Sequence, residues 1–155
     1  MPFYYSVNTS HTTAAGAATQ TLAADTRSVA ARGHAVSRIL AGAKGTAQDN
    51  PCLWQAWRPT VINTVGSAQV AEKHDLLSPA ASTTFQVTPT VGTKGAFPVV
   101  SLPFNSRAMV QWVSLNPDEA LIMSAGATVA GNMAFYSEQA AGVAVAIVNT
   151  TTWYE

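Results

Sequence analysis

The residues that could bind a metal ion lie in one short stretch of the chain. Glu72, His74 and Asp75 fall within four residues and offer the oxygen and nitrogen ligands that divalent ions accept. The other histidines, His11 and His34, lie far away in the sequence, with no metal-ligand spacing between them. On a strand, neighbouring side chains point to opposite faces and do not reach one ion together. We therefore expect a solvated or subunit-facing loop, and neither a metal ion nor another cofactor.

Catalytic residues are not apparent in any recognisable pattern. Acid–base catalysis needs carboxylates that converge, but the acidic residues are scattered, and only Asp118 and Glu119 are adjacent, in a stretch typical of a turn. The sequence has no Gly-x-Ser-x-Gly elbow, phosphate-binding glycine loop or dinucleotide fingerprint. The single cysteine, Cys52, forms no internal disulfide, and we expect it to be a small buried residue. We predict that the chain is not an enzyme, although a serine or cysteine nucleophile with distant partners stays open.

Aromatic residues gather close to both ends of the chain. We predict that five of them contact neighbouring subunits rather than the core: Phe3, Tyr4, Tyr5, Trp153 and Tyr154. Aromatic rings also stack on sugars, so a carbohydrate-binding β-sandwich module with exposed aromatic residues is an alternative. Trp54 and Trp57 are three residues apart and would fall on opposite faces of a strand, which argues against a joint sugar platform.

The composition points to a surface that is covered by other subunits. Only 10% of the 155 residues are charged, against about 25% in an average soluble domain, and 8 basic residues balance 8 acidic ones. Net charge helps free monomers stay soluble, so a neutral and charge-poor surface favours contact with copies of itself or with other proteins. A small soluble protein rich in alanine and threonine is the plainer alternative.

The same composition argues against nucleic acid and membranes as partners. No stretch concentrates Lys or Arg as a polyanion-binding surface requires. No apolar run approaches the roughly 18 residues of a membrane span. The first residues lack the basic and apolar segments of a secretory signal, so we expect synthesis in a reducing cytoplasm.

The first half of the chain gives an uncertain pattern of strands. Residues 1–26 have little to bury, and we predict an extended N-terminal arm that ends in a first short strand at residues 19–24. Residues 25–43 could be helical, with a cap at Asp25 or Thr26, but Gly33 favours a strand at residues 35–43. Further strands are predicted at residues 52–58, stopped by Pro59, and at residues 60–65.

The second half is clearer, because β-branched and aromatic runs recur about every ten residues with Gly, Pro or Asn between them. Residues 116–119 are typical of a hairpin turn. Strands are predicted at residues 84–88, 97–102, 108–115, 120–124, 132–137 and 143–152. We therefore predict an all-β fold, a jelly-roll-like β-sandwich, with the arm at residues 1–26 and a single domain at residues 27–155.

Residues 97–155 resemble a family of small virion proteins. The relevant segments are 101–126 (SLPFNSRAMVQWVSLNPDEALIMSAG) and 131–138 (GNMAFYSE), with a strand that carries Trp112, a turn at Pro117 and a strand that ends in Ser-Ala-Gly. This pattern is similar to the jelly-roll head decoration, or cement, proteins of tailed bacteriophages. The resemblance transfers no functional residue.

The resemblance implies a structural virion protein on the capsid exterior. Its expected partners are the major capsid protein and other copies of itself, as a homotrimer or another homo-oligomer. It would cement the shell by burying apolar area and by exchanging arms or strands with neighbours. A collar or tail adhesin is a second version of the same structural role.

Overall fold

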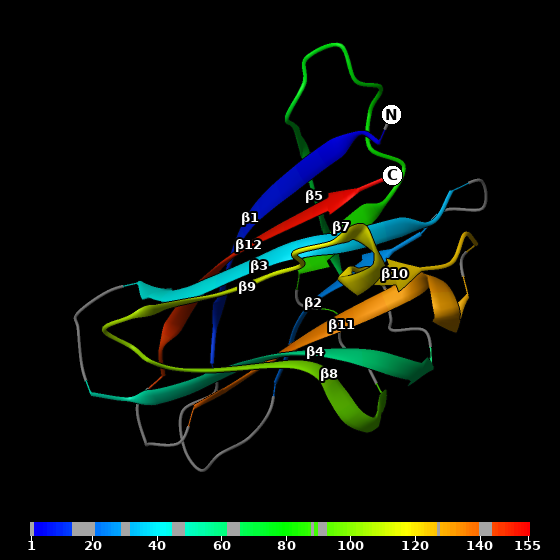
Figure 1. Cartoon of the computed structure of the whole chain (residues 1–155). Coiled ribbons are helices and arrows are strands. Elements are labelled where there is room, and N and C mark those ends of the chain that lie inside the picture. The colour runs from blue at the N-terminus through cyan, green and yellow to red at the C-terminus, as the bar shows by residue number, and fades with distance from the viewer. Residues whose placement is uncertain are drawn as a thin grey trace.

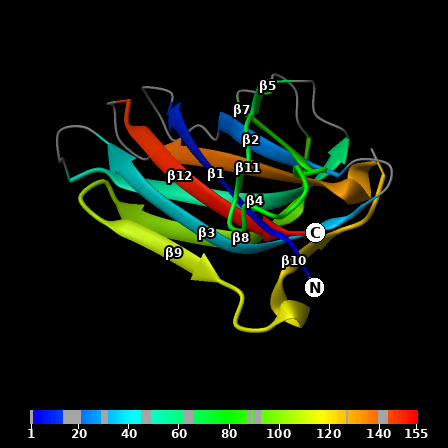
Figure 2. The ribbon, with the colours of Figure 1, turned by 90° about the horizontal axis from the view of Figure 1, so that it is seen from above.

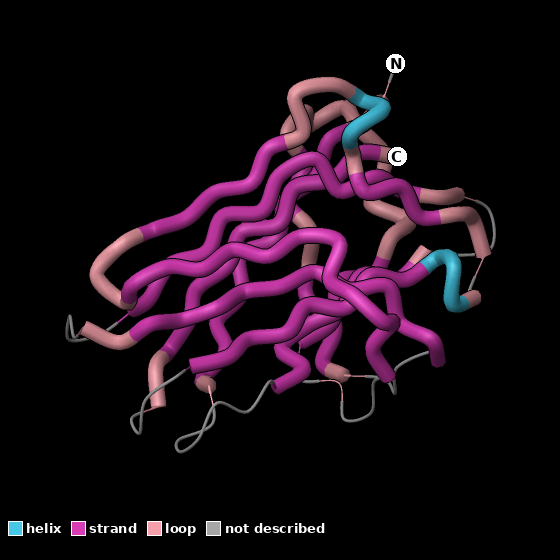
Figure 3. Tube along the Cα trace, turned by 60° about the horizontal axis from the view of Figure 1, so that its bottom comes forward, coloured by secondary structure: helices cyan, strands magenta, loops and turns pink. Residues whose placement is uncertain are grey.

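The computed structural model describes residues 2–13, 21–28, 32–44, 49–61, 66–87, 89, 93–126, 128–139 and 144–155. Two antiparallel sheets pack face to face as a sandwich (Figures 1 and 2). Strands dominate the described part of the chain, and its helical elements are the short 3-10 turns η1 (Pro117–Glu119) and η2 (Val129–Gly131) (Figure 3). The predicted all-β sandwich is confirmed.

Within the described ranges, each sheet contains six strands. The first sheet, called sheet A here, has the order β10 (Leu121–Met123), β3 (His34–Lys44), β12 (Ala146–Tyr154), β1 (Tyr4–Thr12) and β6 (Glu72–Lys73), and β9 (Met109–Val113) pairs with β3 beside β10. The second, sheet B, has the order β5 (Ser67–Gln69), β7 (Thr84–Val87), β2 (Thr21–Arg27), β11 (Asn132–Gln139), β4 (Pro51–Val61) and β8 (Thr93–Asn105).

The strand pairs are nested in the manner of a jelly roll. β1 pairs with β12 and β2 pairs with β11. The strands that follow in the sequence continue this nesting: β3 pairs with β9 and β10, and β4 pairs with β8. The chain is thus one long antiparallel ribbon folded over itself, and its successive pairs alternate between the two sheets.

The segment between β4 and β8 adds strands to both sheets on the same side. β6 pairs with β1 and so extends sheet A, whereas β7 pairs with β2 and carries β5, extending sheet B. Between β5 and β7 the chain projects beyond the sheets, at the end of the molecule where both termini lie (Figure 1). We call residues 70–83 the projecting segment.

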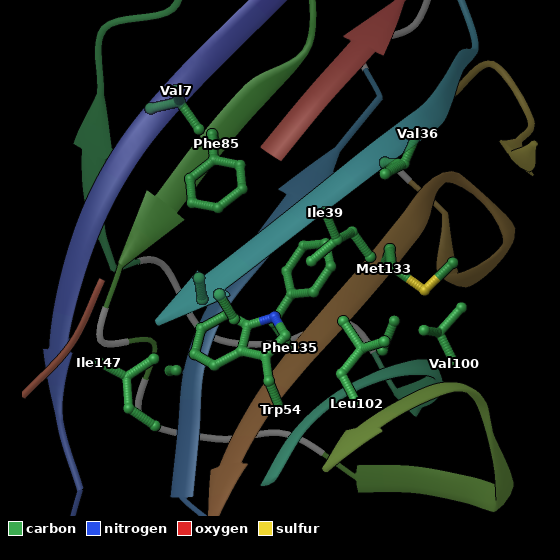
Figure 4. Close-up of a cluster of buried hydrophobic side chains, with 14 of the residues drawn as sticks. Val7, Val36, Ile39, Trp54, Phe85, Val100, Leu102, Met133, Phe135 and Ile147 are labelled. Atoms are coloured by element: carbon green, nitrogen blue, oxygen red, sulfur yellow. The ribbon is translucent and has the colours of Figure 1, made fainter. Parts of the chain in front are cut away.

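A stack of aromatic rings fills the space between the sheets. Neighbouring rings lie 5.9 to 6.3 Å apart between centroids at small interplanar angles. The stack runs, in this order, through Tyr5, Trp153, Phe85, Phe135 and Trp54. Aliphatic residues from both sheets, among them Val36 and Ile39, surround it (Figure 4). Because Tyr5 and Trp153 belong to sheet A and the other three rings to sheet B, the stack ties the two sheets together.

The predicted N-terminal arm is a strand of the domain. β1 pairs with β12 along its whole length, and residues 14–20 lie outside the described residues. Tyr5 and Val7 point into the core, while Asn8 and Ser10 face outward, which is the alternation of a half-buried strand. The arm prediction was wrong because two inward side chains suffice to fix a strand whose other face is polar.

Two further predictions are also wrong: the end of a strand at Pro59 and a hairpin turn at residues 116–119. β4 continues through Pro59, which pairs with Lys94 of β8 at an irregular point of the ladder. Pairing of β4 with β11 ends at Trp57, so Pro59, which has no N–H, has a neighbour strand on one side only. Residues 116–119 do not close a hairpin, because β9 and β10 follow each other along the same edge of β3. Residues 62–65 of the strand predicted at residues 60–65 lie outside the described residues.

Candidate interaction surfaces

The aromatic residues near the two ends of the chain come together, but they do so inside the molecule. β1 and β12 place Tyr4 opposite Tyr154 and Tyr5 opposite Trp153. Tyr5 and Trp153 are fully buried in the aromatic stack, and Phe3 packs partly against the core. Tyr4 is 43% exposed and Tyr154 is half-buried. Tyr5 and Trp153 are therefore core residues, contrary to the prediction that they contact other subunits.

These residues hold the projecting segment in place. The backbone N–H of His74 donates to the Tyr4 carbonyl at 3.0 Å, and the His74 ring stacks on the Tyr4 ring at 6.3 Å between centroids. The Tyr5 hydroxyl donates to the carbonyl of Pro79 at 3.1 Å. Two aromatic residues thus fix the two sides of the segment.

Glu155 makes a third attachment. Its carboxylate accepts the backbone N–H of Ser82 at 3.0 Å and that of Thr83 at 2.7 Å, together with the Ser82 hydroxyl. Burial alone would raise the pKa of this carboxyl, but the hydrogen bonds from Ser82 and Thr83 outweigh burial, and the pKa is lowered. The charged carboxylate therefore anchors the base of the projecting segment.

Between its attachments at His74 and Pro79, the projecting segment forms a tight turn at residues 75–78, which we call the leucine turn. The Asp75 carbonyl accepts the N–H of Ser78 at 3.0 Å, and the Asp75 carboxylate accepts the N–H of Leu77 at 3.0 Å. This aspartate arrangement is common in turns and fixes the backbone. The turn presents Leu76 and Leu77 with 91% and 93% of their surface exposed.

The exposure of this leucine pair is the least expected feature of the surface. Single exposed apolar residues are common, but burying one leucine side chain stabilises by about 1.5–3 kcal/mol. Here two adjacent leucines stand on a backbone that Tyr4, Tyr5 and Glu155 hold in place. Such a knob suits insertion into an apolar pocket of a partner, because little conformational entropy remains to be lost.

A second feature is a groove on the outer face of sheet A, which we call the sheet groove. It crosses four strands and has a volume of about 450 Å³. Its lining includes Asn8, Ser10, Leu40, Gly42, Met109 and Val148. A Cβ atom at Gly42 would lie 2.9 Å from Cγ of Met109, so the glycine makes room for the Met109 side chain, which is 73% exposed. The groove has no charged residue in its lining.

The histidines and acidic residues form no metal centre in the described part of the chain. No group of three or more His, Cys, Asp or Glu side chains there is placed to hold an ion. In the stretch that suggested one, the His74 ring lies against Tyr4, and the Asp75 carboxylate bonds the backbone of its own turn. Cys52 is buried as expected, and burial raises the pKa of its thiol.

His34 takes part in a polar chain between the sheets that sequence reasoning missed. Its Nδ1 lies 2.8 Å from the Ser28 hydroxyl, and its Nε2 lies 2.9 Å from the Thr26 hydroxyl. A serine beside a histidine resembles part of a hydrolase site, but all three residues are buried, so the Ser28 hydroxyl is not exposed to solvent. Burial lowers the pKa of His34 to about 4, so the ring is neutral at neutral pH. The chain of hydrogen bonds therefore links the two sheets.

The tryptophans do not form an open platform for sugars. Trp54 and Trp153 are buried in the core, and Trp112 packs partly buried against it. Trp57 lies on the other face of sheet B against Tyr136, with the ammonium group of Lys94 5.2 Å from its ring centroid. The arrangement is a buried cation–π contact rather than an exposed ring face.

Comparison with known proteins gives no family. No protein-family model, no curated protein and no solved structure matches the chain. Among the described residues, no helix has the length and apolar character needed to cross a membrane.

Proposed function

We propose that this chain is a non-catalytic structural subunit that decorates and cements the capsid shell of a bacteriophage. The observation that carries the proposal is the leucine turn, which displays two almost fully exposed leucines on a backbone held by hydrogen bonds. A rigid apolar knob of this kind stabilises a shell when it enters a pocket of a neighbouring subunit. The partners would be the major capsid protein and further copies of this chain, on the exterior of a virion assembled in the host cytoplasm.

The composition and the architecture support the same proposal. A chain with 10% charged residues and no net charge has little to repel its neighbours. Jelly rolls are an architecture of viral capsid proteins, and also of lectins and cupins. The resemblance of residues 97–155 to phage decoration proteins favours the capsid among these. A collar or tail position would use the same contacts, whereas a sugar-binding role has no exposed tryptophan face to support it.

Binding to shells tests the proposal. The purified chain should co-sediment with phage capsids that lack this protein. It should also raise the temperature at which those capsids release DNA. The variant Leu76→Ser/Leu77→Ser should bind roughly a hundredfold more weakly, because each of the two lost leucine burials corresponds to about a factor of ten or more.

Phe97→Ser is the matched control, since Phe97 is 81% exposed on β8, away from the turn. It should bind as the unmodified chain does. A chain that does not bind shells, or a leucine variant that binds and stabilises them equally well, would overturn the proposal.

A further inference from the structure

We infer that the leucine turn of one copy of this chain docks into the sheet groove of another copy. The inference deepens the proposed function, on which it rests, by naming the partner of the turn and the surface that receives it. The turn offers Leu76 and Leu77, and the groove offers Leu40, Met109 and Val148 among small polar residues. Both surfaces belong to every copy, so the contact repeats from one copy to the next.

The sizes of the two surfaces agree. A cavity of roughly 150 Å³ accommodates one benzene-sized apolar group in a protein core. The sheet groove, at about 450 Å³, therefore has room for both leucine side chains. Because its lining is uncharged, entry of the leucines leaves no charged group of the groove without water.

The charges around the two surfaces also agree. The strands that carry the groove, β1, β3, β9 and β12, contain no Asp or Glu, and β3 carries the exposed basic residues Arg38 and Lys44. The leucine turn contains the exposed acidic residue Asp75, while Glu72 and Lys73 next to it balance each other. A turn that approaches the groove thus brings a negative charge to a positive face, which favours docking over repulsion.

A copy does not fill its own groove. The projecting segment runs along β1 away from the groove, since Glu72 pairs with Ser6, Lys73 with Tyr5, and His74 bonds Tyr4. The turn therefore starts beside Tyr4, and at about 3.3 Å per residue this point lies roughly 13 Å along the strand from Asn8, where the groove begins. With His74 bonded to Tyr4 and Pro79 bonded to Tyr5, the turn is held away from the groove of its own chain.

The contact has a consequence for symmetry. The donor surface and the acceptor surface are different patches, so two copies exchange turns about a two-fold axis, or three or more copies form a ring. In either arrangement each copy gives one turn and receives another. Two such contacts per copy hold the assembly more tightly than one, because the second forms within an assembly already joined.

Native mass spectrometry of the purified full chain, without phage particles, tests the inference. The unmodified chain should be a closed oligomer. Leu76→Ser/Leu77→Ser removes the turn's side chains, and Met109→Lys places a charge in the groove at an exposed position. Each variant alone should be monomeric under the conditions at which the unmodified chain is oligomeric. Phe97→Ser, the matched control, should keep the original mass.

A mixture of the two variants is the sharper measurement. The leucine variant keeps an intact groove and the Met109 variant keeps an intact turn, so one productive contact is left, and a one-to-one heterodimer should form. Circular dichroism should show both variants to be folded. A monomeric unmodified chain, variants that keep the original mass, or a mixture without heterodimer would each overturn the inference. A monomer that still coats shells overturns this inference alone, and an oligomer that does not bind shells overturns only the proposed function.

Discussion

The aromatic stack and the leucine turn are both built from large apolar side chains, but the fold treats them in opposite ways. The stack has no exposed ring and joins five strands across the two sheets. The turn lies outside both sheets and leaves its two leucines in water. The same residues near the chain ends serve both regions, since Tyr5 stacks on Trp153 and also bonds Pro79 of the projecting segment. The comparison teaches that one copy completes its own core, whereas the turn leaves apolar surface that the copy does not cover.

The largest expected effect concerns the core. Trp153→Ala removes the ring that joins Tyr5 to Phe85, and we expect the free energy of unfolding to fall by about 3–5 kcal/mol, from lost burial and the cavity left behind. Urea denaturation followed by circular dichroism measures it. Phe97→Ala, at an exposed position, should change the value by no more than about 0.5 kcal/mol. A loss below about 1 kcal/mol for Trp153→Ala would show that the stack does not hold the sheets together.

The second-largest expected effect concerns His34, whose hydrogen bonds link the two sheets. The pKa of His34 is about 4 in the folded chain and about 6.5 when unfolded, so the unfolded chain binds more protons between these values. The stability that His34 contributes is fully present above pH 6.5 and should be lost as the pH falls toward 4, by about 3 kcal/mol, and this contribution should level off below pH 4.

Urea denaturation at a series of pH values measures this slope. His34→Gln keeps one donor and one acceptor but does not titrate, and it should remove most of the slope between pH 6.5 and 4. A smaller slope should remain, because the pKa values of His11 and Glu155 are also lowered in the folded chain, by burial and by hydrogen bonds respectively. Equal slopes for the unmodified chain and the His34→Gln variant would show that His34 does not cause the pH dependence of stability.

The smallest expected effect concerns the turn. Leu76→Ser/Leu77→Ser should change the free energy of unfolding of the monomer by no more than about 0.5 kcal/mol, because both side chains are exposed in one copy. Urea denaturation at concentrations where the chain is monomeric measures it. A loss as large as that of Trp153→Ala would show that the leucines pack within their own chain, and the contrast between core and turn would disappear.

Much of the strand pattern could be predicted from the sequence, because it depends on local alternation. The strands expected at residues 35–43 and 132–137 appear as β3 and β11, nearly to the residue. Those expected at residues 84–88 and 97–102 appear as β7 and the middle of β8. Local pattern does not show which strands pair, since β1 meets β12 across almost the whole chain.

The interaction surface was harder to predict. The aromatic residues at 3–5 and 153–154 were expected to contact other subunits, but the pairing of β1 with β12 buries Tyr5 and Trp153 in the core. Deleting residues 1–26 would remove β1 and β2, so it would unfold the domain rather than release an arm. A signal for the leucine turn was present, since two leucines stand in the most charged stretch, between Asp75 and Ser78-Pro79. Their exposure follows only from the anchoring of the segment by Tyr4, Tyr5 and Glu155.

The edges of the two sheets set a limit on how copies of this chain meet. Most edge strands are short or contain proline: β5, β6 and β10 have three, two and three residues, and β8 contains Pro98 and Pro103. The exception is β9, which has five residues and no proline. Short strands and prolines at an edge prevent another strand from adding to the ladder. Addition of strands from another copy is therefore disfavoured along most of the edges, and turns and faces remain as the main contact surfaces. Copies that assemble as we propose would then have little tendency to grow into cross-β fibres.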